Sequence, residues 1–128
     1  MIIKQISVFV ENKFGRLAKI TQVLSQNNID IEALSLADTT DFGILRIIVD
    51  KPELALGCLK ENGIVAKSTE VISTEIDNTP GGLSKVLSKL EENDITVEYM
   101  YAFVGKENHI AHMVVKTDNL EKTDQILK

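Results

Sequence analysis

Apolar and polar residues alternate along the first ten positions, MIIKQISVFV, which predicts a half-buried β-strand. Leu17, Ile20 and Leu24 then follow helical spacing and predict a helix with one apolar stripe, which two asparagines end. The stretches IDIEALSLA and GILRIIV predict a second and a third strand, joined by the polar turn DTTD. After Pro52, ELALGCLKEN predicts a second helix and IVAKSTE a fourth strand.

The same pattern starts again 66 positions later, without a gap from Ile6 to at least Leu54. The matching pairs include Gly15 and Gly81, Leu17 and Leu83, Leu24 and Leu90, Asn27 and Asn93, Ile29 and Ile95, and Glu32 and Glu98. The chain is therefore a duplication, and each copy has the β-α-β-β-α-β order of the ferredoxin-like fold. We expect an α+β protein of two tandem modules, each with an antiparallel sheet and helices on one face.

The two modules are expected at residues 1–70 and 71–128. The second copy ends after the helix NLEKTDQILK, where the first copy continues into a fourth strand. One edge of its sheet is therefore expected to lack a strand, and an exposed edge invites pairing. Two explanations stay open: the chain continues beyond Lys128, or a partner chain fills the edge.

Composition excludes several classes of protein. The net charge of −5 and the scattered basic residues argue against a nucleic-acid surface. Cys58 is the single cysteine, so no disulfide and no multi-cysteine metal site is expected. His109 and His112 lie three positions apart on a predicted strand and so point to opposite faces, which disfavours a shared metal ion. We expect no cofactor, no membrane partner and a cytoplasmic protein, because no signal peptide or membrane-spanning run is present.

The stretch DNTPGGLSKVL begins the first helix of the second copy. Thr79 is predicted as the helix N-cap and Pro80 as the first helical residue, with Gly81 and Gly82 leaving backbone N–H groups accessible. The first turn of a helix has unpaired donors and a partial positive charge, which suits a carboxylate. Asn78 stands beside this turn, where its amide oxygen can accept from an ammonium group. A tight turn without a ligand is the alternative interpretation.

The element order together with Asp77, Pro80, Gly81 and Leu83 resembles the ACT domain, the small-molecule regulatory module of amino-acid metabolism. The first copy keeps Gly15 of that turn and has a phenylalanine where the second has proline. The resemblance covers the whole chain as two tandem ACT domains, similar to the stand-alone amino-acid-binding members. It implies that domains pair into larger sheets and that a ligand sits between the strand-to-helix turn and a neighbouring domain.

The resemblance places ligand-binding positions at the same turn in both copies. They are Asn78, Thr79, Pro80, Gly81, Gly82 and Leu83 in the second copy, and Asn12, Phe14, Gly15, Arg16 and Leu17 in the first. Met100 and Tyr101 of the strand EYMYAFV are further candidates, because this aromatic strand either packs in a domain interface or lines the ligand seam. Phe14 either closes the first site or lines a different one.

The leading hypothesis is a regulatory sensor without catalytic activity. It is expected to form a homo-oligomer, specifically a dimer. It would bind a free amino acid or a related small carboxylate and act on an enzyme or regulator outside this chain. One alternative is a structural module that only builds an oligomer. The other is a small enzyme on the ferredoxin-like scaffold, for which Arg16 and Arg46 are the only arginines and lie in no recognisable motif.

Overall fold

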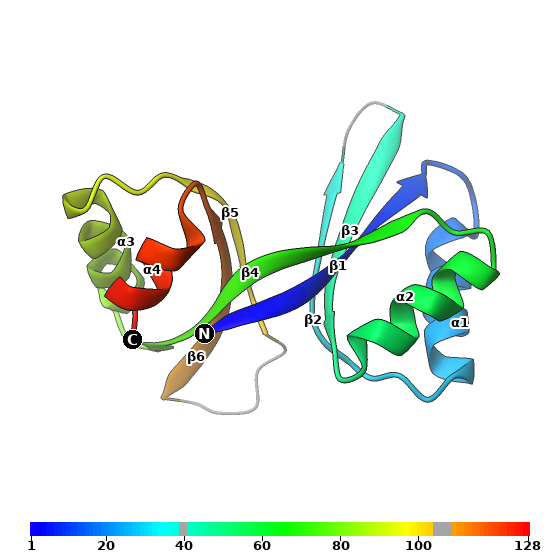
Figure 1. The fold of residues 1–128 in the computed structure, drawn as a ribbon, viewed down its shortest axis with the longest axis horizontal. Helices are drawn as coiled ribbons and strands as arrows, with labels where there is room; N and C mark the ends of the chain where they lie inside the picture. Colours follow the sequence, from blue (N-terminus) through cyan, green and yellow to red (C-terminus); the bar gives the residue numbers. More distant parts are fainter. Residues whose placement is uncertain (39–40, 104–108) are drawn as a thin grey trace. The chain divides into compact units, whose positions relative to one another are not determined.

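A computed structural model describes residues 1–38, 41–103 and 109–128, and it divides into two compact units (Figure 1). One comprises Lys4–Thr69 and is called the N-terminal unit below. The other comprises Glu70–Lys128 together with Met1–Ile3 and is called the C-terminal unit. None of the helices in the described residues is long and apolar enough to cross a membrane.

The N-terminal unit has the predicted order of elements. These are β1 (Ile2–Glu11), α1 (Arg16–Gln26), β2 (Ile31–Asp38), β3 (Phe42–Val49), α2 (Pro52–Glu61) and the start of β4 (Ala66–Asp77). The strands lie in the order β2-β3-β1-β4, and β3 is antiparallel to both of its neighbours. Both helices cover one face of this sheet (Figure 1).

The core of the N-terminal unit lies between that face and the two helices. Alternate residues of β1 point into it, and they meet Ile20 and Leu24 of the predicted apolar stripe of α1, whereas Leu17 of that stripe lies outside the core. The fully buried members include Ile6, Val8, Leu24, Ile47 and Leu59. This packing holds β1 and α1 in one relative position, and it therefore determines the conformation of the turn that joins them.

The C-terminal unit repeats the arrangement with β4, α3 (Gly82–Glu92), β5 (Val97–Ala102), β6 (Ile110–Thr117) and α4 (Leu120–Ile126). The strands lie in the order β4-β6-β5, and both pairs are antiparallel. On the other side of β4, Met1 and Ser73 exchange both backbone hydrogen bonds, at 2.8 and 3.1 Å. Residues 1–3 thus lie along the edge of β4 that faces away from β6.

The predicted α+β fold of two ferredoxin-like modules is confirmed. β4 runs without interruption through the position expected as the module boundary, and its residues belong to both units. The division of the sequence at residues 70 and 71 stays a prediction.

Candidate functional site

The two strand-to-helix turns share one backbone geometry. Gly15 has φ +81° and Gly81 has φ +89°, and each is the N-cap of the helix that follows. Glycine adopts this left-handed conformation without the penalty that a side chain brings. Among the described residues no side chain caps either helix, whereas Asn119 caps α4 by accepting from the N–H of Lys122. The N–H of Arg16 donates to the carbonyl of Lys13 at 3.3 Å, so the donors that no side chain caps are those of the following residues in the first helical turn.

The start of α3 corrects two details of the prediction. Gly81, not Thr79, is the N-cap, and Pro80 lies in the turn before the helix. The carbonyl of Thr79 accepts from the N–H of Gly82 at 3.0 Å, so this donor is already paired. A Cβ on Gly82 would stand 2.0 Å from the carbonyl oxygen of Asp77. Glycine is required here by close backbone packing, a reason different from the predicted accessibility of its N–H.

The turn of the N-terminal unit borders a pocket of about 370 Å³, called the turn pocket below. It lies between the turn and the facing ends of β2 and β3. The lining residues are Val10, Glu11, Asn12, Lys13, Leu17, Leu36, Ala37, Asp38 and Gly43. Gly43 pairs with Val10 on one side and Asp38 on the other, and the lack of a side chain there leaves space beneath Leu36. This volume lies within the range of ligand pockets.

Charges of both signs border the turn pocket. The Lys13 ammonium lies 3.0 Å from a carboxylate oxygen of Glu11, and Asp38 stands across the pocket at the end of β2. The hydrogen bond from Lys13, with its charge and that of Arg16, lowers the pKa of the exposed Glu11 carboxyl below its ordinary value. The pocket therefore offers a cation and an anion beside two leucines, Leu17 and Leu36.

Arg16 lines a different pocket, of about 200 Å³, called the helix pocket below. It lies between α1, the end of α2 and the residues that lead into β4. The lining residues are Phe9, Val10, Glu11, Arg16, Lys19, Ile20, Phe42, Asn62, Gly63, Ile64 and Val65. Phe14 is fully exposed and lines neither pocket. The candidate residues at the turn of the N-terminal unit are therefore split between two pockets. Asn12 and Leu17 line the turn pocket, and Arg16 lines the helix pocket.

In the C-terminal unit the candidates of the turn are also separated. Gly81 borders an open pocket of about 720 Å³ along α3, and Gly82 borders another of about 280 Å³ beside Asp77. The N–H of Asn78 donates to the carbonyl of His109 at 2.9 Å, which ties the turn to the start of β6. Leu83 is 40% exposed, close to the 39% of its counterpart Leu17. The segment that corresponds to the far wall of the turn pocket includes residues 104–108, outside the described part.

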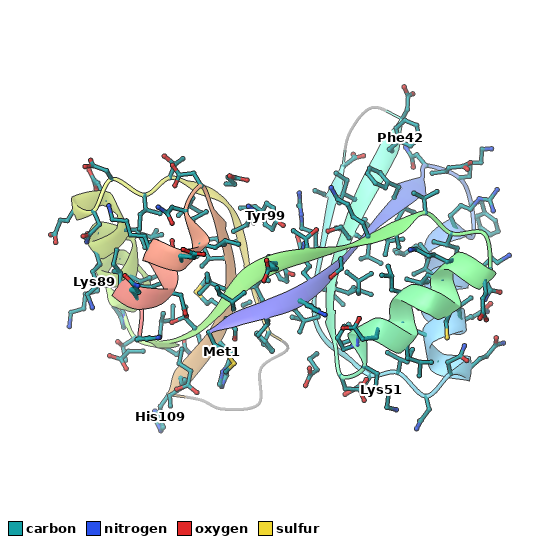
Figure 2. All side chains as sticks on the ribbon, viewed as in Figure 1. Met1, Phe42, Lys51, Lys89, Tyr99 and His109 are labelled. Atoms are coloured by element: carbon teal, nitrogen blue, oxygen red, sulfur yellow. The ribbon has the colours of Figure 1, made fainter. Side chains whose placement is uncertain are left out.

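Met100 and Tyr101 lie away from the turn of their own unit. They pair with Val115 and Val114 of β6, about five residues or ~16 Å along the strand from the turn. As neighbours in a strand they point to opposite faces of the sheet. Figure 2 shows Tyr99 of the same strand well separated from His109. The structure does not bring these two candidates together with Asn78 and Gly81.

Several pocket residues were not among the sequence candidates. In the turn pocket they include Leu36, Asp38 and Gly43, and the available signal was a glycine in a predicted strand, which often marks a site of close approach. In the helix pocket they include Phe9 and Phe42, whose apolar character breaks the alternation expected of a solvated face. Neither signal indicates by itself which element lies opposite. In the described residues no three His, Cys, Asp or Glu side chains form a metal-binding group.

Comparison with known proteins shows where this fold recurs. The chain is similar to the protein BT0572 from Bacteroides thetaiotaomicron, with 42% identity and a TM-score of 0.93 over 99% of this chain and 87% of that one. The ligand-free regulatory subunit of aspartate kinase from Thermus thermophilus has the same fold, with 14% identity and a TM-score of 0.69 over 99% and 93% of the two chains. Escherichia coli aspartokinase III in complex with lysine and aspartate matches with 15% identity and a TM-score of 0.52, over 98% of this chain and 30% of that one. Among curated protein sequences there is no significant match.

A family model described as an ACT domain pair matches residues 1–128. This span includes both turns and all ten helices and strands of the described residues. The chain belongs to the ACT domain pair family.

Proposed function

We propose that this protein is a non-catalytic regulatory sensor that binds a free amino acid. The observation that carries the proposal is the turn pocket, which is lined by one ammonium, two carboxylates and two leucines, with one of the carboxylates paired to the ammonium. A free amino acid presents the complementary set, which is a carboxylate, an ammonium group and a side chain.

Each group of the ligand has a partner in this arrangement. The carboxylate would accept from Lys13 and from the uncapped start of α1, where the helix dipole favours negative charge. The ammonium group would donate to Asp38 and to the amide oxygen of Asn12. The ligand side chain would lie on Leu17 and Leu36, both of which are partly exposed. An amino acid of modest apolar side chain fits this set best.

The family relationship supports the regulatory role. The regulatory subunit of aspartate kinase shares the fold, and aspartokinase III was crystallised with two amino acids. The ligand would act by favouring one arrangement of the protein over another, by no more than its difference in affinity for the two. An enzyme or regulator outside this chain would receive the signal. We place the protein in the cytoplasm, acting as a homodimer.

The test is calorimetric titration of the full chain with each of the twenty amino acids, first on the wild type and then on a matched pair of variants. Leu17→Asp introduces a charge into the turn pocket, and Leu83→Asp makes the same change at the equivalent, equally exposed position of the second copy. We expect Leu17→Asp to abolish binding and Leu83→Asp to leave it unchanged. Binding lost only in Leu83→Asp would place the site at the second turn, and no heat or thermal shift for any amino acid at millimolar concentration would refute the proposal.

The alternative of a purely structural module makes a different prediction. If the turns serve only oligomer assembly, Leu17→Asp should change the oligomer size measured by light scattering and no amino acid should bind. A sensor should lose binding while its oligomer size stays constant.

A further inference from the structure

The helix pocket has no part in amino-acid recognition as proposed above, yet its chemistry is distinctive. Arg16 and Lys19 lie three positions apart on α1 and therefore on one face of the helix. Both side chains border the pocket. Among residues 1–38, 41–103 and 109–128, no ion-pair partner of Lys19 is found, and the Arg16 guanidinium lies 4.0 Å from Glu11.

Glu11 also borders this pocket, so its charge has to be considered. Its carboxylate is held by Lys13 at 3.0 Å, and Lys13 lies outside the helix pocket. The carbonyls at the end of α2 accept from the backbone N–H groups of Asn62, Gly63 and Ile64, so they do not point unpaired into the pocket. Two cations against one paired carboxylate leave the pocket favourable to an anion.

An apolar wall continues from the charged end. Phe9, Phe42 and Val65 are 46, 52 and 66% exposed, and with Ile44 they line an adjoining apolar pocket of about 460 Å³. Phe42 stands at the start of β3, as labelled in Figure 2. Large apolar side chains gathered at an open surface beside placed charges are typical of a binding site.

The second copy provides an internal comparison. The equivalent positions Glu75, Gly82 and Lys85 line a pocket of about 280 Å³ in the C-terminal unit. The hollow itself therefore recurs with the fold. Its chemistry does not, because the second copy has a carboxylate in place of Phe9 and a glycine in place of Arg16.

We propose that the helix pocket is a second binding site, for a small carboxylic acid with an aromatic body and no ammonium group. The carboxylate of the ligand accepts hydrogen bonds from Arg16 and Lys19, and such charge-assisted bonds are stronger than bonds between neutral groups. The ring of the ligand packs against Phe9 and Phe42. The volume of about 200 Å³ accommodates a single ring.

Phenylacetate is the probe for the test, with phenylacetamide as its uncharged counterpart. Both are titrated into the ¹⁵N-labelled full chain and followed by amide chemical shifts. We expect phenylacetate to shift the start of α1 and the residues around Val65, and phenylacetamide to bind about tenfold more weakly. Lys19→Gln and Arg16→Gln should each raise the Kd for phenylacetate roughly five- to tenfold, the effect of losing one exposed charge-assisted bond.

Lys85→Gln is the matched control, since it removes the equivalent exposed lysine of the second copy and should leave the Kd unchanged. Leu36→Ala, a change in the turn pocket that adds no charge, should also leave the Kd unchanged, which separates this site from the turn pocket and from the outcome of the amino-acid titrations. Three results would each overturn the proposal: no saturable shifts around Val65, equal binding of phenylacetamide, or equal weakening by Lys85→Gln and Lys19→Gln.

Discussion

Gly82 is the position where one added methyl group should have the clearest cost. Its Cβ would stand 2.0 Å from the carbonyl oxygen and 3.0 Å from the carbonyl carbon of Asp77. Backbone atoms cannot rotate away as a side chain can, so either the start of α3 or the end of β4 has to move. Such overpacking costs about 1–3 kcal/mol, against about 1 kcal/mol that alanine gains over glycine in a helix. Because 2.0 Å to a backbone atom is a severe overlap, the cost lies in the upper part of that range, about 2–3 kcal/mol, and we expect Gly82→Ala to lower the free energy of unfolding by about 1–2 kcal/mol.

Two glycines of the same chain serve as controls for this change. Gly57 lies inside α2 with no atom within 4 Å of an added Cβ, so Gly57→Ala should raise the free energy of unfolding by about 0.5–1 kcal/mol. Gly81 also has open space around it but a positive φ, so Gly81→Ala isolates the conformational cost, about 1 kcal/mol.

The assay is urea unfolding with linear extrapolation, followed both by circular dichroism and by tyrosine fluorescence, because two units can unfold in separate transitions. Both tyrosines lie in the C-terminal unit, so fluorescence reports on the unit that contains Gly82. The reasoning is refuted if Gly82→Ala is as stable as the wild type while Gly57→Ala shows its expected gain.

Two further predictions concern hydrogen bonds. Thr123 is buried, and its hydroxyl lies 2.7 Å from both the Thr117 hydroxyl and the Asn119 carbonyl. Thr123→Val should therefore lower the free energy of unfolding by about 1–3 kcal/mol in the same assay. An unchanged free energy of unfolding would contradict this prediction. Lys13→Ala should raise the pKa of Glu11 towards its ordinary value in an NMR titration, since Lys13 is the main cause of its depression. Because the pKa of Glu11 is lower in the folded than in the unfolded state, the stabilisation from this pair is present above the unfolded pKa and is lost as the pH falls through the folded pKa. The free energy of unfolding of the Lys13→Ala variant should therefore lack this decrease at acid pH. A Glu11 pKa that is unmoved by Lys13→Ala would show that the pair does not form in solution.

The fold was predictable because the repeat and the hydrophobic pattern agree at every element. Ile20 and Leu24 of the predicted stripe and the alternation in β1 each specify one buried face, so packing had a single consistent solution, whereas Leu17 of the same stripe is exposed at the turn. The turn was also found, since its glycines recur at matching positions. What the pattern did not predict was the exact helix start at Gly81, which depends on a positive φ and on a carbonyl of the preceding strand.

The candidate site was predicted only in part, for a physical reason. The sequence identified one wall of the turn pocket, Asn12 and Leu17, because a local motif marks it. The opposite wall, with Leu36 and Asp38, reaches it through the pairing of β1 with β3 and β3 with β2. Such pairing joins residues distant in the chain, and no local motif records it. For the same reason the sequence grouped Arg16 with the turn, although Arg16 lines the helix pocket.

The hydrogen bonds between Met1 and Ser73 join residues that are 72 positions apart. During synthesis on the ribosome, residues 1–3 therefore emerge long before the strand they will pair with exists. The N-terminal unit can begin to fold once residue 69 has left the exit tunnel, whereas completion of the C-terminal sheet needs both residues 1–3 and residues 70–128. Closing so long a loop is slow, and until it closes the free edge of β4 is exposed to other nascent chains.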